Sequence, residues 1–530
     1  MMNFGLRSRG GKAGRTVLAT SLLVTAVFWG WRQVGTSLES LEIYTRDRMV
    51  RLNADAPPDP RLLVVGVTEA DIQRYRHPLP DGVVAEALGR IVEAQPRAVG
   101  LDIIRDIPQG EGLEDLLKVL ERYPQIVVVC KVGTEAEQGY PPPPGMSKTR
   151  LGFSNFPPDP GGVVRRGLLG IVPPPLPDAV PNPCQDPTEP VFSLGFQLAQ
   201  QYLAAAGLPL TVTDADKLQF GTVVLPPLGP SDGGYQRADT GGYQMLLQYR
   251  SGDRIAEQVT LSQLLEGQVE ADQLRDRIVL VGYVAESVKD LFPTPYSGGQ
   301  NNNRPMPGVV IHAQLVSQIL RTVLDGEPSP WFWPQGAELI WVWSWALVGG
   351  AIASALRHPL ALGAAIGVGV GVCAGVGYLA FLQGGWVLVA TPVLALGLTA
   401  AAVILVDRNG QAIADNVQKV KKIVLRLNVD SEEAKREADK LLEGHEDLIN
   451  VKSVKKGTPK RRSEALLSPD LPSDDDANDR QSVPGDDGAA PAPETDPETD
   501  DLADFLNQIQ MPEDQPLDQS PDRPPDPHQD

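Results

Sequence analysis

Three polar side chains stand within or next to apolar segments, where a ligand could meet them. Asp102 lies in a strand-like run, Asp290 directly precedes the apolar pair Leu291-Phe292, and His312 lies inside an apolar helical segment. An unpaired ionised carboxylate in an apolar strand is costly, and open α/β sheets usually bind ligands at strand ends. We predict that the three form a ligand-binding or signal-gating site, with Asp102 and His312 in one polar network. The alternative is structural: the aspartates cap helices or tie loops to backbone N–H groups, and His312 is a hydrogen-bonded core histidine.

Other chemistry has little support in the residue types. The chain has five histidines and no CxxC pair, which rules out thiolate zinc frameworks. It also lacks G-x-S-x-G, HExxH, Walker and kinase motifs. We therefore expect no catalytic residue, no metal and no cofactor. An outer-face hydrolase stays an alternative, because a triad assembles from distant positions.

The three cysteines are spread widely. Cys373 lies in an apolar run, Cys130 in a strand-like run and Cys184 in a proline-rich stretch. Cys130 and Cys184 could pair in an oxidising compartment. We expect two free thiols, because one cysteine is in a loop and the other is in a buried strand.

Charge and length exclude one class of partner. The 530 residues carry a formal net charge of −20, and most of the acidic excess lies in 463–530. A basic nucleic-acid-binding surface has no support in this composition. The length suggests several domains.

Four apolar runs predict transmembrane helices. The first, 17–34, follows a basic leader, 1–16, and has just the length that a hydrocarbon core of about 30 Å requires. A cleaved signal peptide is the alternative, but no small-x-small site follows Trp31, so we expect an uncleaved anchor. The other three runs are separated by short breaks: 338–356, 360–381 and 386–406.

Basic residues predict the orientation. Lys/Arg excess marks the cytoplasmic side, and it occurs in the leader, at Arg357 and after Arg408. All three sites agree when 35–337 is extracytoplasmic and both termini are cytoplasmic. In the third run, glycines every four residues form a face that another helix can approach closely, within one chain or between two. These are Gly363, Gly367, Gly371 and Gly375.

The outer segment alternates between strand-like and helical patterns. Strand-like runs at 62–68, 98–104 and 126–132 are separated by helical patterns at 82–94 and 113–122. This alternation predicts an α/β domain with a mixed, partly parallel sheet. A proline-rich stretch, 141–190, predicts an extended surface excursion. The alternation resumes with a helix at 191–206, strand-like runs near 222–225 and 243–249, a helix at 260–266, a strand at 277–283 and a helix at 308–321.

An ordered set of motifs in this segment resembles the extracytoplasmic sensory domain of the second CHASE class, which occurs on bacterial cyclases, histidine kinases and Ser/Thr kinases. The resemblance covers roughly 40–325 and implies a sensor in a bacterial inner membrane with an unknown ligand. The motifs are Gly100-Leu101-Asp102-Ile103-Ile104, Gly152-Phe153-Ser154-Asn155-Phe156, Val163-Val164-Arg165-Arg166, Arg277-Ile278-Val279-Leu280-Val281-Gly282, Lys289-Asp290-Leu291-Phe292-Pro293-Thr294-Pro295 and Met306-Pro307-Gly308-Val309-Val310-Ile311-His312-Ala313.

The inner segment begins with a coiled-coil pattern in 407–450. Its apolar steps of 4 and 3 residues are typical of a dimeric coil, and a membrane-surface helix is the alternative. The seam is Ile413, Val417, Val420, Val424 and Leu427.

The rest of the chain, 451–530, is acidic and proline-rich, and we expect it to be disordered. Within it, Leu502, Phe505, Leu506 and Ile509 would share one helix face. This spacing predicts a motif that folds into a partner's groove, although a chance cluster is the alternative.

Taken together, these patterns predict a multi-pass inner-membrane sensor that passes its state through a homodimeric coil to a separate cytoplasmic partner, without an output domain of its own. The main alternative is a scaffolding envelope protein that transmits no signal.

Overall fold

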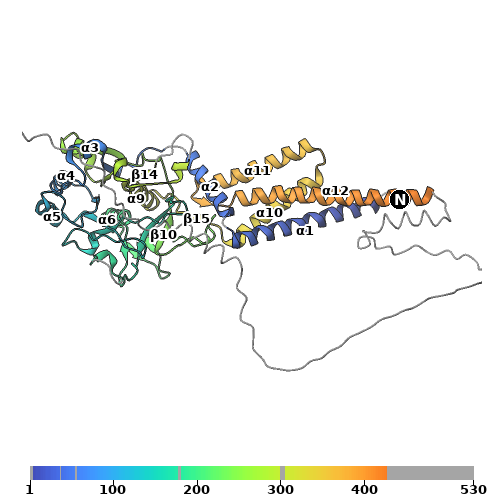
Figure 1. Ribbon diagram of the computed structural model, residues 1–530, viewed down its shortest axis with the longest axis horizontal. Helices are drawn as coiled ribbons and strands as arrows, with labels where there is room; N and C mark the ends of the chain where they lie inside the picture. The colour runs from blue at the N-terminus through green and yellow to red at the C-terminus, as the bar shows by residue number, and fades with distance from the viewer. Residues whose placement is uncertain (1–3, 36, 54–55, 177–180, 299–304, 427–530) are drawn as a thin grey trace, which may run out of the picture. The chain divides into compact units, whose positions relative to one another are not determined.

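A six-stranded parallel sheet forms the centre of the outer domain in the computed structural model (Figure 1). The structure describes residues 4–35, 37–53, 56–176, 181–298 and 305–426. Each pairing in this sheet is parallel, and the small separate sheets of β10 with β5 and of β7 with β8 are antiparallel. In spatial order the strands are β11 (Glu257–Thr260), β1 (Leu62–Val67), β12 (Ile278–Tyr283), β2 (Ala98–Asp102), β3 (Ile126–Cys130) and β4 (Leu151–Phe153).

Helices cover both faces of the sheet because both faces are apolar. Parallel strands buried on both sides are near-continuous apolar runs, and all six residues of β1 are buried. Val65 points to one side and Val64 to the other, so each belongs to a different core cluster. One cluster contains α4 (Asp81–Glu93), α5 (Leu113–Arg122) and α7 (Leu261–Leu265), and the other contains α6 (Leu194–Ala205) and α9 (Gly308–Leu324).

The smaller elements complete the outer domain. They are α3 (Glu69–Tyr75), α8 (Ala271–Leu274), β5 (Arg166–Ile171), β6 (Val191–Phe192), β7 (Leu210–Val212), β8 (Leu218–Phe220), β9 (Val223–Val224), β10 (Tyr243–Leu246), β13 (Leu291–Phe292) and β14 (Met306–Pro307). The strands β15 (Trp331–Phe332) and β16 (Gly385–Trp386) pair with each other next to the membrane helices.

The sequence pattern found most of these elements and misjudged one segment. The helix expected at 113–122 is α5 with the same bounds. The proline-rich stretch 141–190 is not simply a surface excursion, because it contains β4 at the edge of the main sheet and the buried strand β5. Prolines lie around these strands, where no ladder hydrogen bond is lost.

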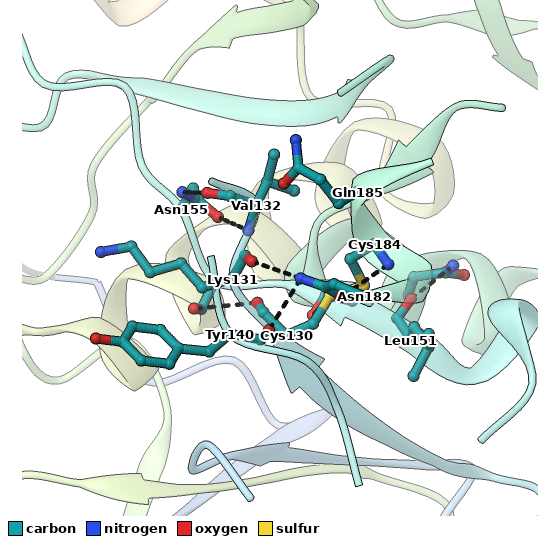
Figure 2. Close-up of a disulfide and its surroundings, with 12 residues drawn as sticks. Cys130, Lys131, Val132, Tyr140, Leu151, Asn155, Asn182, Cys184 and Gln185 are labelled. Atoms are coloured by element: carbon teal, nitrogen blue, oxygen red, sulfur yellow. Dashed lines mark hydrogen bonds between the residues drawn. A yellow bond between two sulfur atoms is a disulfide. The ribbon is translucent and has the colours of Figure 1, made fainter. Parts of the chain in front are cut away.

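Cys130 and Cys184 form a disulfide, so the expectation of two free thiols is wrong (Figure 2). Cys184 is fully buried because its loop folds back onto the chain that follows β3. The Asn182 amide donates to the backbone oxygens of Lys131 and Tyr140 at 3.1 and 3.2 Å. These bonds hold the loop beside the strand.

Within the described residues, four helices are long and apolar enough to cross a membrane. They are α1 (Phe4–Val34), α10 (Gln335–Ala355), α11 (Pro359–Leu382) and α12 (Ala390–Arg426), with candidate spans at Ala13–Val34, Gln335–Ala355, Pro359–Leu382 and Ala390–Asn409 (Figure 1). The first span packs on two others: Phe28 joins a cluster with Val342 and Ala346 of α10 and Ala395 of α12. A segment integrated in this way is typical of a membrane anchor.

The glycine face of α11 does not pack against another helix in the part of the chain that the structure describes. A Cβ atom added at Gly363, Gly367, Gly371 or Gly375 would meet nothing within 4 Å. The opposite face makes the contacts instead, because a Cβ at Gly377 would collide with the Val389 side chain. Close packing of the four glycines against a second chain stays a prediction.

The last membrane helix, α12, extends into the segment in which the sequence predicts a coiled coil. Helix α12 continues to Arg426 without a break, so the backbone of Ile413, Val417, Val420 and Val424 is helical. Leu427 and the motif of Leu502, Phe505, Leu506 and Ile509 lie outside the described residues.

Candidate functional site

A cavity of about 1000 Å³ opens at the carboxyl ends of the parallel strands. Asp102 and Tyr283 are the last residues of β2 and β12, and Lys131 and Ser154 directly follow β3 and β4. All four line the cavity. Open α/β sheets bind ligands at this edge because the loops that follow neighbouring strands converge there.

The structure brings the three predicted residues together, since Asp102, Asp290 and His312 all line this cavity. Burial raises the pKa of Asp102 well above its usual value, and the nearby charge of Asp290 raises it further. Burial also raises the pKa of Asp290 to about 6. Two adjacent carboxylates resist ionising together, so the pair retains a proton more readily than ordinary aspartates do.

Glycine at the start of α9 makes room for the Asp290 side chain. A Cβ atom at Gly308 would lie 2.9 Å from Asp290 Oδ2, and Gly308 itself lines the cavity. The Gly308 N–H donates to the Asp290 backbone oxygen at 3.1 Å. This close approach places the carboxylate beside the N-terminus of α9, where negative charge is favoured.

His312 is not the hydrogen-bonded core histidine of the structural alternative. Its side chain is 1% exposed, and neither ring nitrogen has a hydrogen-bond partner within the described residues. Its ring lies 4.6 Å from the Phe156 ring. Burial lowers the pKa of His312 to about 3, so the ring is neutral at physiological pH. No hydrogen bond joins it to Asp102 in the described chain, and the polar network stays a prediction that needs a bridging group.

Arg105 is a lining residue that the sequence analysis missed. It is 3% exposed, and none of its three guanidinium nitrogens donates a hydrogen bond to a described residue. Its ionic partner is Asp81, with Nε and Oδ1 3.6 Å apart. Burial lowers the pKa of Arg105. The sequence feature that could have indicated Arg105 as a site residue is its position three residues after Asp102, just past the end of an apolar strand.

Aromatic side chains form the apolar part of the cavity. Phe156 and Phe292 meet edge to face with ring centroids 5.1 Å apart. The Tyr283 hydroxyl accepts a hydrogen bond from the Leu79 N–H at 3.3 Å, which fixes the ring at the cavity wall. The cavity thus combines apolar walls with a few convergent polar groups, as small-molecule sites usually do. No group of three or more metal-ligating side chains occurs in the described residues.

A second polar cluster, the α2 network, ties α2 (Ser37–Leu52) to the outer domain. Asp47 of α2 accepts two hydrogen bonds from Arg165, at 3.0 Å from Nε and at 2.8 Å from Nη2. Asp159 accepts from Arg165 at 3.0 Å, from Arg166 at 2.8 Å and from the Tyr235 hydroxyl at 2.8 Å. The side chains of this network are buried. Sequence resemblance singled out both arginines, but it did not show their partners.

The other end of α2 holds the membrane helices. Glu42 is 2% exposed and accepts backbone N–H hydrogen bonds from Val389 at 2.9 Å, Ala390 at 3.2 Å and Thr391 at 2.7 Å. These N–H groups open α12 and have no partner within the helix. Arg32 of α1 donates to the Gly233 oxygen at 2.7 Å, which fastens the first span to the outer domain.

The cavity and the α2 network share one short segment of chain. Phe156 and Pro158 line the cavity, and the next residue, Asp159, binds Arg165 and Arg166. Arg165 in turn binds Asp47 of α2. Three residues of chain therefore separate the lining residue Phe156 from Asp159, and buried ion pairs link Asp159 through Arg165 to Asp47 of α2.

These features describe an α/β domain with a cavity at the strand ends, in a chain whose described residues include four helices that are apolar and long enough to span a membrane. Comparison with family models matches the CHASE2 domain over residues 21–351, well over half of the chain. The chain therefore belongs to the CHASE2 family, whose members are sensory extracellular domains. Comparisons with curated proteins and with solved structures find no match.

Proposed function

We propose that this protein is an inner-membrane sensor that binds an extracytoplasmic small molecule in the cavity and signals to a separate cytoplasmic partner. Asp102, Asp290 and His312 contact the ligand, and the protein has no catalytic role of its own. The observation that carries the proposal is that Phe156 lines the cavity three residues before Asp159, which pairs with Arg165, and that Arg165 also pairs with Asp47 of α2.

Membership of a sensory family and four apolar helices support this proposal. The disulfide also supports an extracytoplasmic location for the domain, because disulfides persist in oxidising compartments. Both ring nitrogens of His312 are buried without a hydrogen-bond partner in the described residues, and the Asp102 carboxylate lines the same cavity beside Asp290. A scaffolding protein has no need of a cavity lined by such groups.

A reporter fusion tests the proposal. A kinase or cyclase output joined after Leu427 should respond to fractions of growth medium or envelope extract in whole cells. Asp102→Asn and His312→Gln should each abolish the response while the protein stays folded and in the membrane. The matched control is Asp276→Asn, which changes an exposed aspartate that pairs with Arg97 outside the cavity. Constant output across all fractions would favour the scaffolding alternative, and a full response from both cavity variants would remove these residues from the site.

A further inference from the structure

The cavity contains a cation that lacks sufficient acceptors. Arginine has five N–H donors in a fixed planar fork, yet Arg105 makes no hydrogen bond to the described residues. Its ion-pair distance of 3.6 Å to Asp81 is too long for a hydrogen bond. Asp81 Oδ2 accepts from the Gln109 N–H at 2.8 Å, and its Oδ1 faces only Nε of Arg105, so both terminal nitrogens of the guanidinium stay without an acceptor in the described residues. The group that suits a buried guanidinium is a planar carboxylate, which can bind both arms of the fork.

The same cavity contains two acids that lack donors. Asp102 and Asp290 accept no side-chain hydrogen bond from any described residue, although both are largely buried at the cavity wall. A cation between them would relieve their repulsion. The side chains here do not form a metal-ligating group within the described chain. An ammonium group is the cation that fits, since it offers three donors to surrounding oxygens.

The dimensions limit the ligand to a small molecule. Asp102 and Arg105 are three residues apart, so their Cα atoms are separated by at most about 11 Å. In the same cavity, Phe156 and Phe292 offer an apolar surface. His312 adds a neutral imidazole, which supplies one donor and one acceptor.

Resting on the sensor function proposed above, we propose that the cavity binds a small zwitterion with an apolar body, the chemistry of an apolar amino acid or a short apolar peptide. Its ammonium group binds Asp102 and Asp290, and its carboxylate binds Arg105. The apolar body packs on Phe156 and Phe292, and His312 bonds to a polar group of the ligand. The bound ligand thereby supplies the bridge that the predicted polar network requires.

Calorimetric titration of the detergent-solubilised full chain tests this ligand class with four probes. L-phenylalanine and L-leucyl-L-phenylalanine carry both charges, L-phenylalaninamide lacks the carboxylate, and N-acetyl-L-phenylalanine lacks the ammonium group. We expect saturable binding of at least one of the two zwitterions, at least about tenfold tighter than either blocked probe, because each loses a charge-assisted contact.

Reciprocal variants assign the two ends. Arg105→Gln should weaken binding of the zwitterion at least about tenfold and leave the affinity for phenylalaninamide unchanged. Asp102→Asn should weaken the zwitterion and phenylalaninamide alike and leave N-acetylphenylalanine unchanged. Arg97→Gln is the control, since Arg97 packs on Tyr202 and pairs with Asp276 outside the cavity. Because the unmodified protein with four probes already decides the ligand class, a variant that fails to fold does not obscure the result.

Specific outcomes overturn the inference. Absence of saturable binding by both zwitterions, or equal affinity for the blocked probes, would contradict it. If the reporter nevertheless responds to another fraction, and Asp102→Asn abolishes that response, the sensor function would stand and only the zwitterionic ligand would be excluded. Conversely, tight binding of phenylalanine with constant reporter output would preserve the ligand class and contradict the sensor function.

Discussion

The carboxylate of Glu42 accepts a hydrogen bond of 2.7 Å from the backbone N–H of Thr391, so α2 caps the first turn of the last membrane helix. Val389 and Ala390 donate to the same carboxylate. A side chain distant by almost 350 residues thus satisfies N–H groups that a helix cannot satisfy itself. This contact makes α2 the mechanical link between the outer domain and α12.

Replacing Glu42 should loosen this link. Glu42→Ala leaves two buried N–H groups and one half-buried N–H group without an acceptor, and we expect a loss of about 2–4 kcal/mol in the free energy of unfolding. Denaturant unfolding of the full chain in detergent measures it. Arg48→Gln, on the exposed side of α2, should change stability by less than about 0.5 kcal/mol. Equal stability of Glu42→Ala and the unmodified chain would show that the cap is unimportant.

The buried pair of Asp47 and Arg165 should show strong energetic coupling. Removing one partner leaves a charge buried, so Asp47→Asn or Arg165→Met should each cost about 3–5 kcal/mol. The double variant should cost less than the sum by at least about 1 kcal/mol. The exposed pair of Lys118 and Asp115 is the control, with coupling below about 0.5 kcal/mol. Strictly additive losses at Asp47 and Arg165 would contradict the network.

Loss of the disulfide should destabilise the outer domain. Cys130 and Cys184 are 54 residues apart, and opening a closed loop of this size costs about 2–4 kcal/mol. Cys184→Ser should therefore lower the melting temperature, and a reducing agent should lower that of the unmodified chain by a similar amount. Cys373→Ser, which removes the free thiol, should leave the effect of reductant intact. A reductant-insensitive melting temperature would show that the bond does not stabilise the fold.

Two cavity residues should impose opposite pH dependences on stability. The pKa of His312 is lowered to about 3. Its contribution to the free energy of unfolding is therefore present above pH 6.5 and is lost as the pH falls toward 3. The pKa of Asp290 is raised to about 6. Its contribution to the free energy of unfolding is therefore present below pH 3.8 and is lost as the pH rises through 6. Melting of the full chain from pH 4 to 8 should show that His312→Gln removes part of the acid-side loss. Asp290→Asn should remove part of the decline between pH 4 and 6, and unchanged profiles would contradict both assignments.

The orientation is tested by cysteine labelling. Asp115→Cys introduces a thiol at an exposed site of α5, and Ser468→Cys introduces one in the acidic tail. A membrane-impermeant maleimide should label the first in intact spheroplasts and the second only after lysis. Labelling in the reverse order would overturn the predicted sidedness.

Some elements of this protein could be predicted because the burial of their residues produces a recognisable pattern in a short stretch of sequence. The runs at 62–68 and 277–283 are apolar except for their end residues Thr68 and Arg277, as strands covered on both faces must be, and their apolar parts form β1 and β12. Helix α2 was missed because its buried face consists of Leu38, Glu42, Arg46, Asp47 and Val50. Charged residues dominate this face, so no apolar stripe marks it.

The candidate site was predictable only as separate residues. Asp102, Asp290 and His312 stood out because polar groups in apolar segments need a reason. Arg105 gave no such signal, since a charged residue after a strand is usually exposed. Its burial depends on Asp81 from the start of α4 and on the cavity wall, which strand pairing brings together.

The sequence by itself determined the four apolar helices, the α/β alternation and the family resemblance, because each depends on patterns within a short stretch of chain. Only the tertiary structure decided that Cys130 meets Cys184, that Glu42 caps α12 and that two acids, a histidine and an arginine surround one cavity. These relationships join residues that are far apart in the chain. The stability of each contact depends on a partner residue from a distant part of the chain, which a local sequence pattern does not identify.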